Sequence, residues 1–235
     1  MEKSNRMKET AILAGGILLG LAILGFCLKG GIDNLVNKDR RVTVKGLSVK
    51  TAESDEVAWT IQTKSTGNDL AELHSQINKN VDTVKEFLVS KGIAENEISV
   101  SAPSVTDHTA DTYSSNKPPY HYSVLSKVKV VSTNVKLVRK VIDEQGELLS
   151  KGIAVEDNTI NYYLNSFPDM KPTMMAEAIK NAEKTAQLFA ENSHSTLNKI
   201  ETADQGLFSI DDGDEYTNFV KSVRVVTTVT YSLKD

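Results

Sequence analysis

The stretch from Phe167 to Ile210 constrains the fold of this chain most, because it contains one long amphipathic segment followed by a strand. Apolar residues recur in it at helical spacing, which predicts a helix with a single buried stripe. The stripe consists of Met175, Ile179, Ala182, Ala186 and Phe189. Pro172 suits the first turn of that helix, where a missing N–H costs nothing. The two alanines would let the helix lie close to the element that it covers, which we expect to be a sheet.

Alternating apolar residues predict strands on both sides of this helix. They are Val42–Gly46, Val57–Gln62, Ile98–Ala102, Tyr122–Val130, Ile160–Leu164, Lys199–Ala203 and Val223–Tyr231. Two further helices are expected, one capped by Asp69 and ending near Leu88, and one from Asn134 to Ile142. This order predicts an α+β fold of two β-α-β-β halves, joined by the Asn134 helix, with helices packed on antiparallel sheets.

The composition describes a globular protein without the charge of a nucleic-acid binder. Hydrophobic residues make up 40% of the 235 residues and charged residues 25%, which argues against wholesale disorder. The net charge is −4, whereas nucleic-acid-binding domains usually carry a basic surplus. We therefore expect no nucleic-acid partner.

A run of 18 residues without charge, Ala11 to Leu28, predicts a membrane segment. As a helix it would be about 27 Å long, close to the roughly 30 Å hydrocarbon core of a bilayer. A buried core helix is disfavoured because the run is apolar on every face. A cleaved signal peptide is the alternative, although the residues around Cys27 do not form a small-x-small cleavage site. We predict an uncleaved transmembrane anchor.

The anchor would divide the chain into four parts. They are a cytoplasmic N-terminal tail (residues 1–10), the transmembrane anchor (11–28), a tether (29–40) and a folded domain (41–235). Basic residues lie on both sides of the anchor, namely Lys3, Arg6, Lys8, Lys29, Lys38, Arg40 and Arg41. Because the two sides are nearly balanced, the positive-inside rule does not decide the orientation.

Two acidic or histidine-containing segments resemble metal sites only weakly. His108 and His121 lie near Asp107 and Asp111, but the paired ligand spacing of zinc sites is missing. Asp211, Asp212, Asp214 and Glu215 surround Gly213 without the ligand spacing of an EF-hand, which predicts a solvated acidic turn between two strands. We therefore predict no catalytic residue, no metal ligand and no cofactor.

The loop from Asp107 to His121 is a candidate interface. It carries tyrosine and proline residues, which offer contact area with little loss of conformational entropy. These residues are Tyr113, Pro118, Pro119 and Tyr120, with Tyr122 just beyond the loop. A loop that is only mobile is the alternative.

Three segments together resemble the SIMPL-domain family, also called DUF541: Val44–Trp59, Phe167–Ile210 and Val223–Leu233. The residues that carry the resemblance are Gly46, Asp55 and Trp59 in an expected first hairpin, Ala176, Ala178, Asn181 and Ala182 in the long helix, and Gln205 and Gly206 after it. The resemblance covers roughly Arg41 to Leu233. It implies a bacterial cell-envelope protein, often membrane-anchored or periplasmic, that tends to form homo-oligomers and is loosely linked to stress defence. It supplies no catalytic residue.

These observations predict a single-pass protein of the cytoplasmic (inner) membrane, with its SIMPL-type domain in the periplasm or outside. The domain would be non-enzymatic, acting as a self-assembling or interaction module linked to the stress response. The expected partners are the membrane and other copies of the chain, and a protein partner is not identified. Two alternatives stay open: a membrane-tethered metal-dependent hydrolase that uses the loop between His108 and His121, and a signalling adaptor that faces the cytoplasm if the anchor runs the other way.

Overall fold

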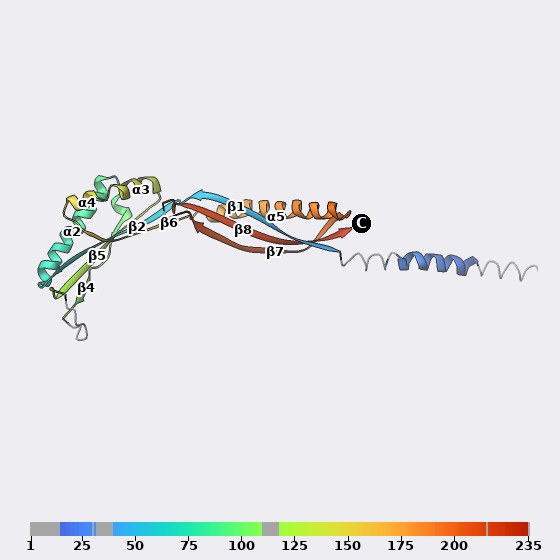
Figure 1. The fold of residues 1–235 in the computed structure, drawn as a ribbon, viewed down its shortest axis with the longest axis horizontal. Coiled ribbons are helices and arrows are strands. Elements are labelled where there is room, and N and C mark those ends of the chain that lie inside the picture. Colours follow the sequence, from blue (N-terminus) through green and yellow to red (C-terminus); the bar gives the residue numbers. More distant parts are fainter. Residues whose placement is uncertain (1–14, 30, 32–39, 110–117, 215, 235) are drawn as a thin grey trace, which may run out of the picture. The chain divides into compact units, whose positions relative to one another are not determined.

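The computed structural model describes residues 15–29, 31, 40–109, 118–214 and 216–234. The chain divides into two compact units, and Figure 1 shows the elements of each. Unit 1 is drawn from residues 1–50, 172–209 and 224–235, and unit 2 from residues 51–171 and 210–223. Segments far apart in the sequence thus build each unit.

Unit 1 is a three-stranded sheet with one long helix on one face. The strands are β1 (Arg41–Glu53), β8 (Val220–Lys234) and β7 (Thr196–Asp212), in the order β1-β8-β7, and the helix is α5 (Phe167–Asn192) (Figure 1). The Leu233 N–H donates to the Arg40 carbonyl at 2.9 Å, and the Thr43 and Thr230 hydroxyls lie 2.9 Å apart. From the first of these contacts to the second, the residue number rises on β1 and falls on β8, so the two strands are antiparallel. The core consists of Val44, Val229 and Tyr231 packed on Ala182 and Ala186.

The buried stripe of α5 differs from the predicted one. Its buried residues are Met174, Ala178, Ala182, Ala186 and Ala190. The prediction was right for Ala182 and Ala186 but wrong for Ile179 and Phe189, which are 38% and 57% exposed. Met175 is only partly buried. Four of the five buried residues are alanines, whose small side chains let the helix lie close to the sheet.

Gly46 on β1 is the point of closest approach between sheet and helix. A Cβ atom at this position would lie 1.9 Å from the Ala178 carbonyl oxygen and 2.7 Å from the Ala182 nitrogen. No side chain larger than hydrogen fits there without moving the helix. The Asn181 side-chain amide donates to the Leu47 carbonyl at 2.8 Å, which fixes the helix along the strand at the same place.

Asp55 sets the start of α5. Its carboxylate accepts hydrogen bonds from the N–H groups of Asn165 and Ser166, both at 2.7 Å, directly before the helix begins at Phe167. Pro172 therefore lies inside the helix, and the prediction that it occupies the first turn was wrong. The sequence pattern around Pro172 could not reveal this, because the capping carboxylate comes from a residue 110 positions earlier.

Unit 2 is an antiparallel sheet covered by helices. Its strands are β2 (Glu56–Gly67), β3 (Ile98–Val100), β4 (Ser104–Asp107), β5 (Tyr122–Ser132) and β6 (Val155–Tyr163). They run in the order β3-β5-β2-β6, with β4 also paired to β5, and every pairing is antiparallel. The helices are α2 (Leu70–Ser90), α3 (Val135–Asp143) and α4 (Glu147–Ser150), and a short 3-10 helix, η2 (Glu95–Glu97), leads into β3 (Figure 1).

The core of unit 2 matches the sequence pattern closely. Trp59 and Ile61 of β2 are fully buried with Val128 and Val130 of β5, against apolar residues of α2 and α3. The predicted cap of α2 is confirmed, because the Asp69 carboxylate accepts from the N–H groups of Ala71 and Glu72.

The α+β class with helices on antiparallel sheets is confirmed, but the first hairpin predicted within Val44–Trp59 was wrong. β1 pairs with β8, whereas β2 pairs with β5 and β6. At the bend between them, the Ser54 N–H donates to the Phe219 carbonyl and the Asp55 N–H donates to the Tyr163 carbonyl. These bonds hold the bend to distant parts of unit 2, so β2 does not fold back on β1. The predicted order of elements is found, because β2, α2, β3, β4 and β5 precede α3 and α4, and β6, α5, β7 and β8 follow them. The two runs are intertwined, since β6 of the second run pairs with β2 of the first.

The predicted transmembrane anchor gains no support from the structure. Residues 15–29 form a helix, while Ala11 to Ala14 lie outside the described residues, as do the N-terminal tail and most of the tether. In the described part of the chain, no helix is both long and apolar enough to cross a membrane.

The close contact at Gly46 predicts a large effect of adding one methyl group. Gly46→Ala should lower the free energy of unfolding by about 2 to 3 kcal/mol, because the new Cβ meets helix backbone that cannot move aside cheaply. Gly146→Ala is the matched control, since a Cβ there has no atom within 4 Å. Urea unfolding followed by circular dichroism measures both. Equal stability of the two variants would contradict the close packing.

The role of Asp55 predicts a pH-dependent loss of stability. Burial raises the pKa of this carboxyl, but hydrogen bonds from Ser166 and Asn165 outweigh it and lower the pKa below the ordinary 3.8. A lowered pKa stabilises the fold above the unfolded-state value, and the stabilisation disappears as the pH falls through the folded-state value. Asp55→Asn should therefore cost about 1 to 2 kcal/mol at pH 7 and much less at about pH 3.

Asp204, exposed on β7, supplies the control for this experiment. Urea unfolding of the Asp55→Asn and Asp204→Asn variants between neutral and acidic pH gives both dependences. A deficit of Asp55→Asn that stays constant over the whole range would show that the carboxylate charge is not what caps α5.

Candidate interaction surface

The sheet of unit 1 has one face packed on α5 and one open face. Side chains of β8 alternate between the two faces, and Val223, Val225, Thr227, Val229 and Tyr231 are buried on the helix side. Side chains in between, such as Val226, Thr228 and Thr230, are only partly buried. On β1 the corresponding residues Thr43, Lys45, Leu47 and Val49 are exposed. We call this set of β1 and β8 side chains the open face.

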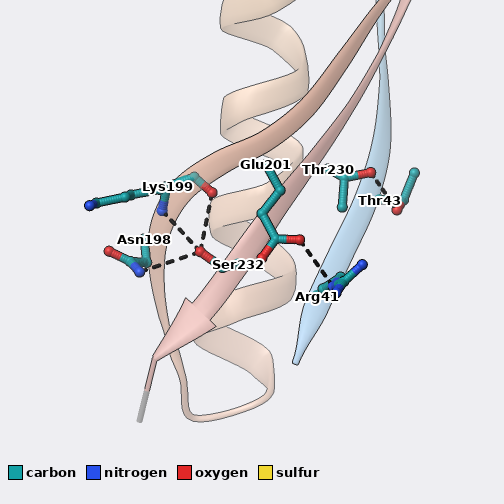
Figure 2. Close-up of polar contacts among 7 residues, drawn as sticks. All are labelled: Arg41, Thr43, Asn198, Lys199, Glu201, Thr230 and Ser232. Atoms are coloured by element: carbon teal, nitrogen blue, oxygen red, sulfur yellow. Dashed lines mark hydrogen bonds and ion pairs between the residues drawn. The ribbon is translucent and has the colours of Figure 1, made fainter. Parts of the chain in front are cut away.

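Polar contacts join the three strands at one end of the open face, as Figure 2 shows. Arg41 Nε lies 3.0 Å from a Glu201 carboxylate oxygen, and this ion pair reaches from β1 to β7 across the intervening strand β8. The Ser232 hydroxyl contacts the Asn198 side-chain amide and the backbone N–H and C=O of Lys199, all at 3.3 Å. Exposed pairs of this kind are worth less than about 1 kcal/mol each. The arrangement orders the strand ends and contains no group activated for chemistry.

β7 is one of the two edge strands of this sheet, and β1 is the other. β7 is 17 residues long, and nearly all of its residues are exposed. Leu207 is 95% exposed, which is unusual for a leucine within a strand. The neighbouring Gly206 approaches β8 so closely that a Cβ there would lie 2.2 Å from the Val226 carbonyl oxygen. A long edge strand with exposed apolar side chains is a ready template for pairing with another strand.

The outer surface of α5 adds a second exposed apolar area in unit 1. Leu188 and Phe189 are both more than half exposed, one after the other near the end of the helix. The sequence pattern did not predict this exposed area, because it placed Phe189 in the buried stripe of the helix.

The histidine pair is used in packing within unit 2. The His108 N–H donates to the His121 carbonyl at 2.8 Å, so the ends of β4 and β5 do bring the two residues together. The His108 ring lies 3.0 Å from the Ser123 hydroxyl and packs edge-on against Tyr120, and the His121 ring packs edge-on against Tyr122. Asp107 accepts from the Thr109 hydroxyl and N–H, which lowers the pKa of its carboxyl. Asp111 lies outside the described residues. Within the described ranges, no group of three or more histidine, cysteine, aspartate or glutamate side chains is placed to hold a metal ion.

The structure describes Pro118, Pro119, Tyr120 and Tyr122 of the predicted interface but does not test their role. Tyr113 lies outside the described residues, Pro119 is exposed, and Pro118 and Tyr120 are partly buried. Tyr122 packs against a small core of Leu73, Ile77 and Val124. Intramolecular packing therefore accounts for Tyr122, and the interface role of the loop stays a prediction.

Asp211 and Asp212 are the last residues of β7, and Asp214 lies in the connection to β8, so the prediction of an acidic turn between two strands holds for Asp214. Asp214 accepts from the N–H groups of Tyr216 and Thr217 and from the Thr217 hydroxyl, and these bonds lower the pKa of its carboxyl. Asp212 pairs with the buried Lys221. Glu215 is outside the described residues. The described acidic groups are thus used to shape the turn.

Comparison with protein families decides the family of the chain. The model of SIMPL, described as a protein of unknown function (DUF541), matches residues 42–228. The chain belongs to the SIMPL family. A comparison with curated proteins finds no match.

The residues that carry the SIMPL resemblance have structural roles. Gly46 and Gly206 permit close approach of backbone, and Asp55 caps α5. Trp59 is fully buried, and its indole N–H donates to the Asn158 side chain. Sequence reasoning missed that β7 continues to Asp212 as an exposed strand at an edge of its sheet. The alternation Gly206-Phe208-Ile210 was the available signal that the strand continues beyond Ala203.

Proposed function

We propose that this SIMPL protein is a membrane-anchored protein of the cell envelope whose domain outside the cytoplasm is a self-assembling interaction module. The observation that supports this most is the exposed edge of β7. Unpaired backbone groups along an edge strand, combined with an apolar side chain such as Leu207, favour the addition of another strand. A module of this kind needs no reacting group.

A second copy of the chain is the occupant that we propose for this edge. Two identical edge strands can pair antiparallel about a two-fold axis, so each copy offers the same surface to the other. Such pairing would extend the sheet of unit 1 beyond β7. It would cover exposed apolar side chains of β7 such as Leu207, and their burial contributes binding free energy.

The proposed anchor rests on the sequence from Ala11 to Leu28. Within this run, residues 15–29 are helical, and their leucine, isoleucine and phenylalanine side chains, among them Leu18 and Phe26, are exposed. A lipid environment would remove these side chains from water at a gain of roughly 25 cal/mol per Å². The location of the domain outside the cytoplasm and the link to stress defence enter the proposal from the family resemblance alone.

Self-assembly through β7 predicts that one exposed residue controls the mass of the assembly. Residues 38–235 should form oligomers in solution, and Leu207→Glu should convert them to monomers, because a charge cannot be buried in the paired edge. Leu207 is 95% exposed in the single chain, so the substitution should leave the free energy of unfolding unchanged within about 0.5 kcal/mol. Multi-angle light scattering at micromolar concentrations measures the mass.

Leu149→Glu is the matched control for this prediction. Leu149 is an exposed leucine on α4 of unit 2. It belongs neither to β7 nor to the open face. Its substitution should leave the oligomer intact. A monomeric parent protein would overturn the assembly proposal, and an unchanged mass of Leu207→Glu would remove β7 from it. Shortening the loop between Thr109 and Lys117 tests the predicted interface loop independently of β7. If the loop contributes to assembly, this deletion should lower the mass of the oligomer.

A further inference from the structure

Unit 2 contains a groove between the edge strand β3 and the helix α2. The groove has a volume of about 700 Å³, within the usual range for binding sites. Its lining is Asp82, Lys85, Glu86, Val89, Ser90, Glu95, Ile98 and Val100. All of these residues belong to unit 2, so the groove is complete within that unit.

One wall of the groove is an edge strand with unused backbone groups. Ser99 and Val100 pair with Lys129 and Val128 of β5, and the Ser101 N–H donates to the Lys127 carbonyl at 3.0 Å. In an antiparallel ladder, successive residues direct their backbone groups to opposite sides. Since Ser101 and Ser99 face β5, Val100 directs its N–H and C=O away from β5, toward the free edge. No described residue is hydrogen-bonded to these two groups.

The same strand supplies an apolar floor. Ile98 and Val100 lie opposite the buried Val130 and Val128, so their side chains are on the helix-covered face of the sheet. Val100 is nevertheless 43% exposed, and Val89 across the groove on α2 is 41% exposed. The helix layer thus stops short of the sheet edge, and one further strand would fit beside β3 with a side chain between Val100 and Val89.

The charges around this floor are mainly negative. Asp82, Glu86 and Glu95 line the groove with one lysine, Lys85. Asp82, Glu86 and Val89 follow one another at spacings of four and three residues, so they lie on one side of α2. None of the three carboxylates takes part in an ion pair with another described residue, in contrast to Glu144 and Glu147, which pair with Lys91.

We propose that this groove binds an extended basic peptide of a partner protein, which adds as a strand to β3. One peptide residue pairs with the Val100 N–H and C=O and places an apolar side chain between Val100 and Val89. Residues two positions before and after it point to the same face of the new strand, where lysine or arginine meets Asp82, Glu86 and Glu95. The ligand pattern is therefore basic-x-apolar-x-basic. This site is independent of self-assembly through β7, because the two edges belong to different units.

Fluorescence anisotropy with three labelled probe peptides tests the proposal on the full-length chain in neutral detergent. The first probe contains Lys-Thr-Val-Thr-Lys, the second replaces both lysines with glutamate, and the third replaces the valine with proline. The first probe should bind saturably. The glutamate probe should bind at least about tenfold more weakly because it loses charge complementarity. The proline probe should bind at least about tenfold more weakly because it loses one backbone hydrogen bond.

Two substitutions in the protein distinguish strand addition from general attraction of charge. Glu86→Lys should weaken binding of the first probe at least about tenfold. Val100→Pro should do the same, because it removes the N–H that faces the free edge and leaves the bonds to β5 in place. Glu72→Lys, at the other end of α2, is the control and should bind as the parent does. Thermal unfolding verifies that each variant is folded.

Equal binding of the lysine and glutamate probes would overturn the proposal, and so would binding that survives Val100→Pro. An oligomer of the parent protein that is lost in Glu86→Lys would assign the groove to a second copy and would also overturn it. Leu207→Glu should leave peptide binding unchanged, so the failure of either proposal can be recognised separately.

Discussion

The close contact between α5 and β1 at Gly46 determines how unit 1 is built. Because a Cβ at Gly46 would collide with the Ala178 carbonyl, the helix must present alanines to the sheet. The hydrogen bond from Asn181 to the Leu47 carbonyl and the contact of the Ser48 hydroxyl with Glu177 hold the helix in that register. With α5 packed on one face, the opposite face of the sheet stays open, and Ile179, Leu188 and Phe189 of the helix are exposed.

Much of the fold follows from local patterns, and the exceptions have identifiable causes. The start of α2 was predicted correctly because its cap, Asp69, is the residue directly before the helix. The stripe of α5 was misplaced because the contact at Gly46 admits only small side chains. The first hairpin was predicted wrongly because Tyr163 and Phe219, which hold the bend, lie far away in the sequence.

The candidate surfaces were less predictable than the fold, since an edge is a property of strand order. The sequence indicated a strand at Lys199–Ala203, but only the pairing of β8 with both β1 and β7 shows that β7 is an edge. The two edges differ in character. β7 is long and carries the exposed Leu207, which suits an identical strand, whereas β3 has three residues beside a groove lined by carboxylates, which suits a short basic peptide.

Hydrogen exchange as a function of protein concentration tests the central claim, that the SIMPL domain assembles through β7. The backbone amides of Thr196–Leu207 should exchange more slowly as the concentration rises, because about half of them face the free edge in the single chain and would be hydrogen-bonded in the assembly. Amides of β5, which pairs on both sides with other strands, should not respond. Exchange in β7 that is independent of concentration, in a sample whose mass rises over the same range, would contradict the account.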